Sequence, residues 1–524
     1  MPDLFPIDDR SAAPLRADPA APATDLDPED LDPKDWAAFR AAAHAALDTA
    51  LDYTETIRDR PVWQPTPALV REALTARLPA QGEGIAAVCD QFAELVLPYA
   101  TGNTHPRFMG WVHGGGNVAG VVGEMLAAAI NANLGGRDHA PILLERQVIG
   151  WMAALFGLPA ETGGLMVTGT SIANLIGVLI ARAAAAGPAV RRTGVAALRL
   201  TAYTSAAAHG CIPRAMDMAG LGTDALRLVP TDPAGRMDLG ALQAAIVADR
   251  AAGQTPFLVV GTAGTVDIGA IDDLAGLAAL CRRERLWFHV DGAFGALAAF
   301  APELRPKLAG IEAADSLAFD FHKWGQVPYD AGCILVRDPR LAEQAFAAPA
   351  AYLRHEARGL AGGAPWPCDF GPDLSRGFRA LKVWFTLKTW GAERLGRAIA
   401  QSCRLAQALA ARVAAEPELE LLAPVALNIV CFRYRFAGAE ADARTAALVA
   451  DLQEAGIAAP STTMIGGRLA IRAALVNHRT RAEDIAVLVD AVLAFGRRSA
   501  ATGDQPAATG DQAVATGDQA VTAG

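Results

Sequence analysis

Short apolar runs separated by helix-like segments fill residues 120–340, and they constrain the fold more than any other feature of the sequence. Such alternation is typical of a sheet whose strands are covered by helices on both faces. We therefore predict an α/β fold with a mostly parallel, seven-stranded central sheet. The seven runs are "GLMVT" (164–168), "LRLTAY" (198–203), "LRLV" (226–229), "FLVVG" (257–261), "LWFHVD" (286–291), "SLAF" (316–319) and "GCILV" (332–336).

The segments on either side of this region have a different character. Residues 34–110 contain amphipathic stretches separated by Pro and Gly, which predicts an N-terminal helical segment ahead of a large domain over 111–374. Over 375–498 a long helical stretch is followed by strand-like "LNIVCFRYRF" and "RLAIRAALV", which predicts a small C-terminal α+β domain. We expect a flexible lead over 1–33 and a disordered tail over 499–524, where "ATGDQ" repeats every seven residues.

Charge and cysteine content exclude several classes of protein. Hydrophobic residues make up 52% of the 524 residues and charged residues 19%, as in well-buried globular proteins. The net charge of −10, without a long basic run, predicts no nucleic-acid partner. The seven cysteines are scattered and form no C-x-x-C pair, which indicates reduced thiols in a cytoplasm and no metal site. No apolar stretch is long enough to span a bilayer, and the N-terminus predicts neither a signal nor a transit peptide.

Two candidate binding features fall at the ends of predicted strands, where α/β sheets bind ligands. In "VTGTSIANLIG" (167–177) a strand runs through a Gly–Thr–Ser turn into a helix, and the free amides of a helix start suit a phosphate. Thr170 or Ser171 can equally be an ordinary helix cap. Asp291 ends the run "LWFHVD" and needs a partner if buried; it either caps the next turn or pairs with a protonated ring nitrogen.

Three further residues have a chemical and an ordinary interpretation. Lys323 in "FHKW" is either a loop lysine or an amine for Schiff-base chemistry, because desolvation lowers the pKa of a lysine and frees its amine. His209 is either structural or a ring that stacks on a flat cofactor. Tyr352, in a Gly- and Pro-rich segment, is either a packing residue or a proton donor on a mobile lid. A phosphate cradle, a stacking His, an Asp and a Lys are together the parts that hold pyridoxal phosphate.

Seven motifs lie along the chain in a fixed order: "HPRFMGW" (105–111), "GTAGTVDIGAIDD" (261–273), "HVDGAFGA" (289–296), "FHKW" (321–324), "AAYLRHE" (350–356), "SRGFRALKVWF" (375–385) and "RAALVNHRT" (472–480). In this order they resemble the group II pyridoxal-phosphate-dependent amino acid decarboxylases, which include aromatic-L-amino-acid, glutamate and histidine decarboxylases. The resemblance covers about residues 34–495. It implies fold type I, pyridoxal 5'-phosphate as cofactor, and a homodimer with the active site at its interface and the N-terminal helices wrapped around the partner.

The resemblance also implies roles for matching positions. Lys323 would form the Schiff base with the cofactor, Asp291 would pair with the pyridine nitrogen, and Ala293 would pack beside the ring. His209 would stack on the ring, and Tyr352 would protonate the carbanion after carbon dioxide leaves. The cofactor's phosphate side would be held by Gly169, Thr170, Ser171 and Ile172, with His322 nearby and Thr265 retained from a family Gly–Thr–Thr motif.

The substrate is indicated less directly. Relatives that act on aromatic substrates carry Phe–Pro–Thr at the segment matching 112–114, where this chain has Val–His–Gly followed by two more glycines. The glycines either leave space for a ligand or let it approach the backbone. His113 either contacts a polar or acidic side chain of the substrate or lies at the surface. We expect an aromatic L-amino acid in a pocket that includes Trp111, His113 and Gly114, with an acidic amino acid as the alternative.

Other readings of the same residues stay open. An aminotransferase of this fold would bind the substrate carboxylate through an arginine of the small domain, for which Arg472 is the candidate. Aldehyde synthases of the family carry Phe where this chain has Tyr352. A non-catalytic protein of the same fold is disfavoured by the intact Lys323. Asp320, where many relatives carry Asn, has no expected role, because an acid beside a phosphate is unfavourable.

Overall fold

The computed structural model describes residues 31–348 and 355–502 of the chain. Tyr352, the expected lead up to residue 30 and the expected tail from residue 503 lie outside these residues. The last helix, α15 (Ala482–Thr502), continues into the first residues of the stretch that we expected to be disordered.

All seven predicted strands are present and form one sheet in the order β2-β8-β7-β6-β5-β3-β4. All of them run parallel except β8, which is antiparallel to both of its neighbours, so the prediction of a mostly parallel sheet is confirmed. The strands are β2 (Gly163–Val167), β3 (Leu200–Ser205), β4 (Leu226–Val229), β5 (Thr255–Thr262), β6 (Trp287–Asp291), β7 (Ser316–Asp320) and β8 (Gly332–Val336).

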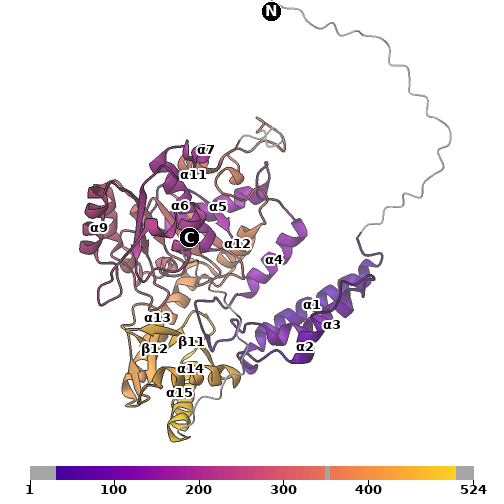
Figure 1. Ribbon diagram of the computed structural model, residues 1–524. Coiled ribbons are helices and arrows are strands. Elements are labelled where there is room, and N and C mark those ends of the chain that lie inside the picture. Colours follow the sequence, from indigo (N-terminus) through magenta and orange to yellow (C-terminus); the bar gives the residue numbers. More distant parts are fainter. Residues whose placement is uncertain (1–30, 349–354, 503–524) are drawn as a thin grey trace, which may run out of the picture.

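Alternate side chains of these strands enter two different cores, which is why the strands carry apolar residues on both faces. In β7, Leu317 and Phe319 belong to the large core, whereas Ala318 belongs to a second core under α6 (Thr170–Ala186). On the α6 side of the sheet lie also α8 (Cys211–Met218) and α11 (Pro339–Phe346). The large core is covered by α5 (Ala140–Leu155), α9 (Leu239–Ala251), α10 (Leu274–Glu284) and α12 (Arg379–Trp390), and α4 (Val118–Ile130) packs on α12 (Figure 1).

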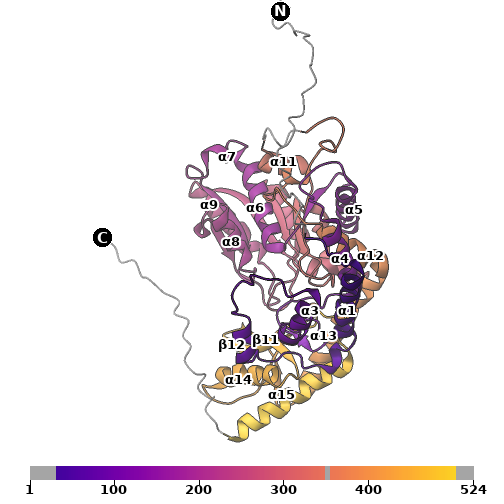
Figure 2. The same cartoon turned by 90° about the vertical axis from the view of Figure 1, so that its right-hand side faces the viewer.

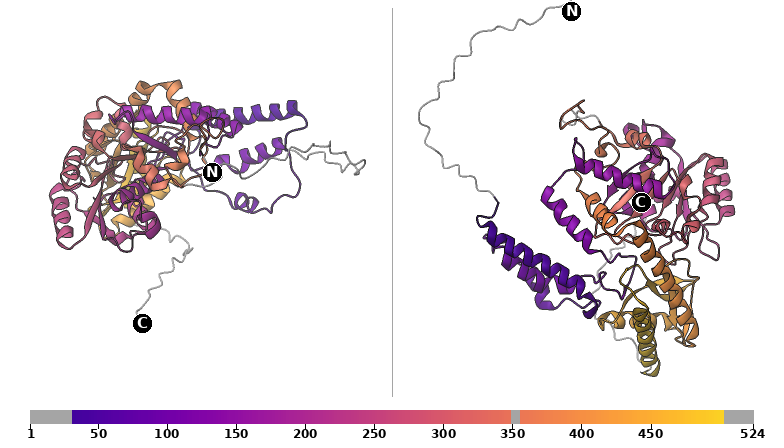
Figure 3. Two further views of the ribbon diagram at one scale, coloured as in Figure 1. Left: turned by 90° about the horizontal axis from the view of Figure 1, so that it is seen from above. Right: turned by 180° about the vertical axis from the view of Figure 1, so that it is seen from behind.

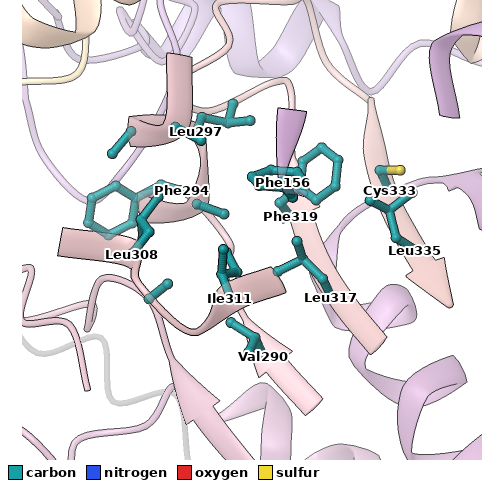
Figure 4. Packing of buried hydrophobic residues seen from close by; sticks show 14 of the residues in the cluster. Phe156, Val290, Phe294, Leu297, Leu308, Ile311, Leu317, Phe319, Cys333 and Leu335 are labelled. Atoms are coloured by element: carbon teal, nitrogen blue, oxygen red, sulfur yellow. The ribbon is translucent and has the colours of Figure 1, made fainter. Parts of the chain in front are cut away.

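Aromatic side chains of the large core anchor the loops that leave β6 and β7. The ring of Phe319 packs edge-on against Phe156 at 5.3 Å and against Phe321 at 5.2 Å, measured between ring centroids. Phe294, just beyond β6, lies 5.6 Å from Trp324. Figure 4 shows Phe156, Phe294 and Phe319 within one buried cluster. Both loops therefore start from a packed and rigid base.

The C-terminal part forms a second sheet in the order β1-β11-β12-β10-β9, which confirms the predicted small α+β unit. Its first strand, β1 (Phe108–Met109), comes from far earlier in the chain and pairs in parallel with β11 (Ala459–Ile465). The other elements of this unit are β9 (Leu419–Leu421), β10 (Ile429–Tyr434), β12 (Arg468–Ala474), α13 (Ala392–Ala415), α14 (Ala441–Glu454) and α15 (Figure 2).

The N-terminal helices project from the rest of the molecule (Figures 1 and 3). They are α1 (Trp36–Glu55), α2 (Ala68–Ala73) and α3 (Ile85–Leu95). Every residue of α1 and α3 is at least partly exposed, and the apolar side chains of Trp36, Val88 and Phe92 are about half exposed. None of the helices in the described part of the chain combines the length and apolar character needed to cross a membrane.

A buried ion pair ties the start of α12 to α5 and β2. Arg376 donates to Glu145 Oε1 at 2.5 Å and to the carbonyl of Met166 at 2.6 Å. We expect Arg376→Met to lower the free energy of unfolding by about 3–5 kcal/mol, because it leaves the Glu145 carboxylate buried without its counter-ion. Denaturant unfolding of the two proteins measures this difference.

The matched control is Arg404→Met, which breaks an ion pair with Glu303 whose two side chains are more than half exposed. We expect it to change the unfolding free energy by less than about 1 kcal/mol. An equal loss in both variants would show that burial of the Arg376 pair has no special effect.

Candidate active site

A cavity of about 510 Å³ lies at the carboxyl ends of the parallel strands, and its size suits a small-molecule ligand. It brings together Thr170, His209, Asp291 and Lys323, which are spread over more than 150 residues of sequence. Of the other residues expected at the site, the cavity is also lined by Trp111, His113, Gly169, Ser171, Ala293 and His322.

Lys323 lies in the turn that follows β7, and its partner is Asp320, the last residue of that strand. The Nζ atom of Lys323 is 2.8 Å from Asp320 Oδ2. Burial alone would lower the pKa of Lys323, but the Asp320 carboxylate, with Asp291 further off, raises it above its ordinary value. Our expectation that desolvation frees the amine is therefore wrong for this lysine: its partner keeps it an ammonium.

Asp320 also fixes the start of α6. Its second oxygen, Oδ1, accepts the amide N–H of Thr170 at 2.8 Å, and its side chain is almost fully buried. Burial opposes the ionisation of Asp320, but the Lys323 ammonium outweighs it and lowers the pKa of the carboxyl. The residue for which the sequence indicated no role thus joins the lysine to the anion-binding turn.

The turn before α6 fits a phosphate group. Gly169 precedes the helix in an extended conformation, and the Thr170 hydroxyl is buried yet has no hydrogen-bond partner within the described residues. A buried orphan hydroxyl at the start of a 17-residue helix is a donor suited to an anion. Ser171 is exposed beside it, whereas Ile172 does not line the cavity and its N–H donates to the Gly169 carbonyl at 3.0 Å.

His322 lies next to Lys323, and a backbone hydrogen bond to one of its ring nitrogens holds it. Nδ1 accepts the amide N–H of Ala331 at 3.0 Å, and Nε2 is 3.6 Å from Asp320 Oδ2. Burial lowers the pKa of His322, partly offset by the Asp320 carboxylate, so the ring is neutral at pH 7. Because the His322 imidazole is neutral, the positive charge beside Asp320 is that of Lys323.

Asp291 presents a carboxylate on the neighbouring strand, at the end of β6. It is 3% exposed, and its Oδ1 accepts the amide N–H of Ala293 at 3.1 Å. Burial raises the pKa of the Asp291 carboxyl, and the charge of Lys323 opposes that shift. A buried carboxylate in a cavity needs a cationic or N–H partner, which a protonated pyridine nitrogen supplies. An amine, a carboxylate and an anion turn in one cavity are the donor set that pyridoxal phosphate requires.

His209 lies in the turn after β3 and lines the cavity with an exposed side chain. Its Nδ1 accepts the amide N–H of Cys211 at 3.2 Å, which fixes the direction of the ring. Cys211 lines the same wall, although the sequence indicated no role for it.

Part of the cavity wall is aromatic. The His113 ring stacks on Phe108 and on Trp111, each at 5.7 Å between centroids, and meets the edge of Tyr329 at 6.0 Å. Burial and the charge of Lys323 lower the pKa of His113, so this imidazole is neutral. Tyr329 was missed by the sequence analysis because it lies in a stretch that reads only as a turn into β8.

Besides Ile172, two residues expected at the site do not line the cavity. Gly114 does not line the cavity; a Cβ atom there would lie 2.3 Å from the His322 carbonyl oxygen and 2.4 Å from that of Lys323. This glycine therefore makes room for the lysine loop, not for a ligand. Thr265 is also outside the lining, and its hydroxyl accepts the Ala270 amide at 3.0 Å within its own turn.

Arg472, the candidate carboxylate-binding arginine, is occupied by other parts of the protein. Its guanidinium donates to the carbonyls of Val266 and Trp111 and to the Ser461 hydroxyl. The residue is buried and does not line the cavity.

Comparisons with known proteins agree with this geometry. Residues 67–435 match the model of the pyridoxal-dependent decarboxylase conserved domain. The aromatic-L-amino-acid decarboxylase of Bacillus atrophaeus is 31% identical over 456 residues, or 85% of this chain and 93% of that protein. The L-2,4-diaminobutyrate decarboxylase of Rhizobium meliloti (strain 1021) is 33% identical over 461 residues, or 87% and 91%. A crystal structure of Oryza sativa TDC with PLP and tryptamine has a TM-score of 0.82 at 27% identity and covers 90% of this chain and 99% of that one.

Proposed function

The chain belongs to the family of pyridoxal-dependent decarboxylases and is a carboxy-lyase that uses pyridoxal 5'-phosphate, and we propose that it converts an aromatic L-amino acid to the corresponding amine and carbon dioxide. The observation that carries the proposal is the presence of Lys323 and Asp291 in one cavity with the anion-binding turn of Thr170. Bound pyridoxal phosphate supplies an electron sink for the bond that breaks at the substrate Cα.

The residues of the chain would bind the cofactor and position its reacting groups. Lys323 would hold the cofactor covalently through Nζ, and Asp320, whose Oδ2 lies 2.8 Å from Nζ, would keep that nitrogen in position beside the anion-binding turn. Asp291, as a carboxylate, would stabilise a proton on the pyridine nitrogen of the bound cofactor. Thr170 and Ser171 would bind its phosphate, and the His209 ring would lie against the face of its ring. For carbon dioxide to leave, the cavity would have to orient the substrate carboxylate perpendicular to that ring.

The aromatic wall supports an aromatic substrate. Trp111, His113 and Tyr329 offer ring faces and edges to a planar side chain. An acidic substrate would need a cation, and within the described part of the chain the cavity lining includes no arginine and no lysine other than Lys323. A diamino acid would need a carboxylate, and the two that line the cavity, Asp291 and Asp320, already have other partners.

A panel of L-amino acids tests this choice of substrate. The holoenzyme is incubated separately with tryptophan, tyrosine, phenylalanine, glutamate and 2,4-diaminobutyrate, and the amine formed is measured by chromatography. We expect the highest kcat/KM with an aromatic member. A higher kcat/KM with glutamate or 2,4-diaminobutyrate would contradict the aromatic assignment without affecting the decarboxylase assignment.

Transamination is the second reaction that this fold could perform, and the position of Arg472 speaks against it. The donors of this arginine are taken up by backbone carbonyls and a serine hydroxyl, so it is not available to bind a substrate carboxylate. Strong fixation of the carboxylate by a guanidinium would also oppose its departure.

The product depends on the proton donor that acts after carbon dioxide leaves. For this role we propose Tyr352, on the resemblance of its segment to the family lid. We expect Tyr352→Phe to shift the product from the amine to the aldehyde, with dissolved dioxygen accepting the two electrons and the amino group leaving as ammonia, measured by chromatography of the amine and the aldehyde. The matched control is Tyr329→Phe, which makes the same change at the cavity wall and should leave the amine as the main product. Amine as the main product of Tyr352→Phe would contradict the role of this tyrosine.

The exposed apolar residues of α1 and α3 support a homodimer with the active site at its interface. Trp36, Val88 and Phe92 are about half exposed, and so are Trp111 and Tyr329 at the cavity. Exposed large apolar side chains of this kind are typical of a contact surface. All seven cysteines are free, which supports a reducing compartment such as the cytoplasm. Light scattering of the holoenzyme should give the mass of two chains, and the mass of one would contradict the dimer.

A further inference from the structure

A row of buried polar side chains leads through the protein to Asp291. Trp287 Nε1 donates to Ser316 Oγ at 2.8 Å, and Ser316 Oγ is 2.7 Å from His289 Nδ1. His289 Nε2 is 2.8 Å from Asn174 Oδ1, so the row crosses from β6 and β7 into α6. Ser316 is 2% exposed and both His289 and Asn174 are 0% exposed, so solvent does not compete for these bonds.

The chemistry of the two ends gives this row a direction. An indole N–H only donates, and an amide oxygen only accepts. His289 Nε2 must therefore carry the hydrogen that Asn174 Oδ1 accepts. Burial lowers the pKa of His289 to about 3, so the ring is neutral and its Nδ1 accepts the Ser316 O–H. Each member thus accepts from the residue before it and donates to the residue after it.

The row ends at the Asp291 carboxylate through a thiol. Asn174 Nδ2 donates to Cys211 Sγ at 3.2 Å, and Cys211 Sγ lies 3.8 Å from Asp291 Oδ2, in position to donate. Burial and the Asp291 charge raise the pKa of Cys211 to about 12, which keeps the thiol protonated and able to donate.

Local packing shows that the fold makes room for this row. Gly177, one turn after Asn174 on α6, faces the imidazole: a Cβ atom there would lie 2.7 Å from His289 Cε1 and 2.8 Å from Nδ1. A side chain at this position would displace the ring from both of its partners. Gly177 is thus needed for the close approach of the histidine to the helix.

We propose that Trp287, Ser316, His289, Asn174 and Cys211 form a donor relay that holds Asp291 as a carboxylate directed at the pyridine nitrogen of the cofactor, with His289 as the central positioning residue. Hydrogen bonds to the charged form of a carboxyl counteract the effect of burial, which here disfavours that form. A relay whose bonds all point one way polarises each member toward the last. The proposal rests on the role proposed for Asp291 and is independent of the identity of the substrate.

The test reads the protonation of the ring nitrogen directly. Holoenzyme is reconstituted with pyridoxal phosphate carrying nitrogen-15 in the ring, and its chemical shift distinguishes a protonated from a neutral pyridine. We expect the protonated signal in the unchanged enzyme and a shift toward the neutral signal in His289→Leu, which leaves Asn174 Oδ1 without a donor. The accompanying loss in kcat/KM should be roughly ten- to a hundred-fold, as for outer partners of metal ligands.

A second pair of variants keeps the test decisive if His289→Leu does not fold. Cys211→Ala removes the last donor and should shift the nitrogen signal, whereas Cys211→Ser retains an O–H donor and should restore it. The control Tyr203→Phe removes a buried hydroxyl that donates to Asp249 at 2.7 Å, outside the relay, and should leave the signal unchanged.

Asp291→Asn separates failure of the relay from failure of the role proposed for Asp291. If Asp291→Asn shifts the signal but the relay variants bind cofactor with the unchanged signal, the relay is overturned and Asp291 keeps its role. If Asp291→Asn itself leaves the ring nitrogen protonated, the role of Asp291 is wrong and the relay proposal falls with it.

Discussion

Lys323→Ala is expected to lower kcat by roughly 10⁴-fold or more. The variant loses the amine that binds the cofactor covalently and that the amino group of the substrate replaces on the cofactor. It also leaves the buried Asp320 carboxylate without the ammonium that lies 2.8 Å from it. Steady-state amine production with saturating pyridoxal phosphate measures the effect. The matched control is Lys388→Ala on the exposed face of α12, which should keep full activity.

Borohydride reduction shows whether the effect has the proposed cause. Reduction of the unchanged holoenzyme followed by proteolysis should leave the phosphopyridoxyl group on the peptide that contains Lys323. The same treatment of Lys323→Ala should leave every peptide unmodified. An unmodified Lys323 peptide from the reduced enzyme would refute the assignment of this lysine.

Asp291→Asn is expected to lower kcat/KM by roughly 10²- to 10³-fold, because a neutral amide of the same shape does not stabilise a proton on the pyridine nitrogen. Asp291 is 3% exposed, so water cannot replace the lost charge. Cofactor affinity, measured by fluorescence quenching, should fall much less than kcat/KM, because the phosphate contacts near Thr170 are unchanged.

The control for Asp291→Asn is Asp249→Asn, a carboxylate on α9 that is also largely buried, pairs with Arg227 at 2.9 Å and does not line the cavity. It should affect stability and leave kcat/KM within a few-fold of the unchanged enzyme. Similar losses in kcat/KM for both variants would show that the effect of Asp291→Asn arises from the fold and not from the site.

The central sheet was predictable because both of its faces are buried. Strands such as "GCILV" and "SLAF" carry apolar residues on both faces, so the apolar runs and their flanking turns locate them without knowledge of their neighbours. The two-residue strand β1 was not predictable, because it exists only by pairing with β11, about 350 residues later. Local sequence carries no signal for such a partner.

In the candidate site, too, features with a local sequence signal were predictable and features that depend on distant contacts were not. Lys323, Asp291 and Thr170 were located by their positions at strand ends and helix starts, which sequence reveals. The role of Asp320 could not be predicted from the sequence, because it depends on a hydrogen bond with Thr170, which is 150 residues away in the chain. The packing around Gly114 could not be predicted for the same reason: the atoms that require a glycine there are carbonyl oxygens of His322 and Lys323, distant in sequence.

The pKa of Lys323 shows how a general rule depends on contacts that only the fold supplies. Desolvation lowers the pKa of a lysine, but the fold places Asp320 Oδ2 at 2.8 Å, and the carboxylate reverses the direction of the shift. The lysine and the aspartate therefore act as one ion pair, in which the ammonium and the carboxylate stabilise each other's charge.

The assignment as a decarboxylase is tested most directly by following the carboxyl carbon of the substrate. Holoenzyme is incubated with an aromatic L-amino acid labelled with carbon-13 at the carboxyl group, and labelled carbon dioxide, amine and keto acid are measured over time. We predict that labelled carbon dioxide and amine appear in equal amounts and that no keto acid forms. Keto acid that retains the label, without carbon dioxide, would contradict the assignment.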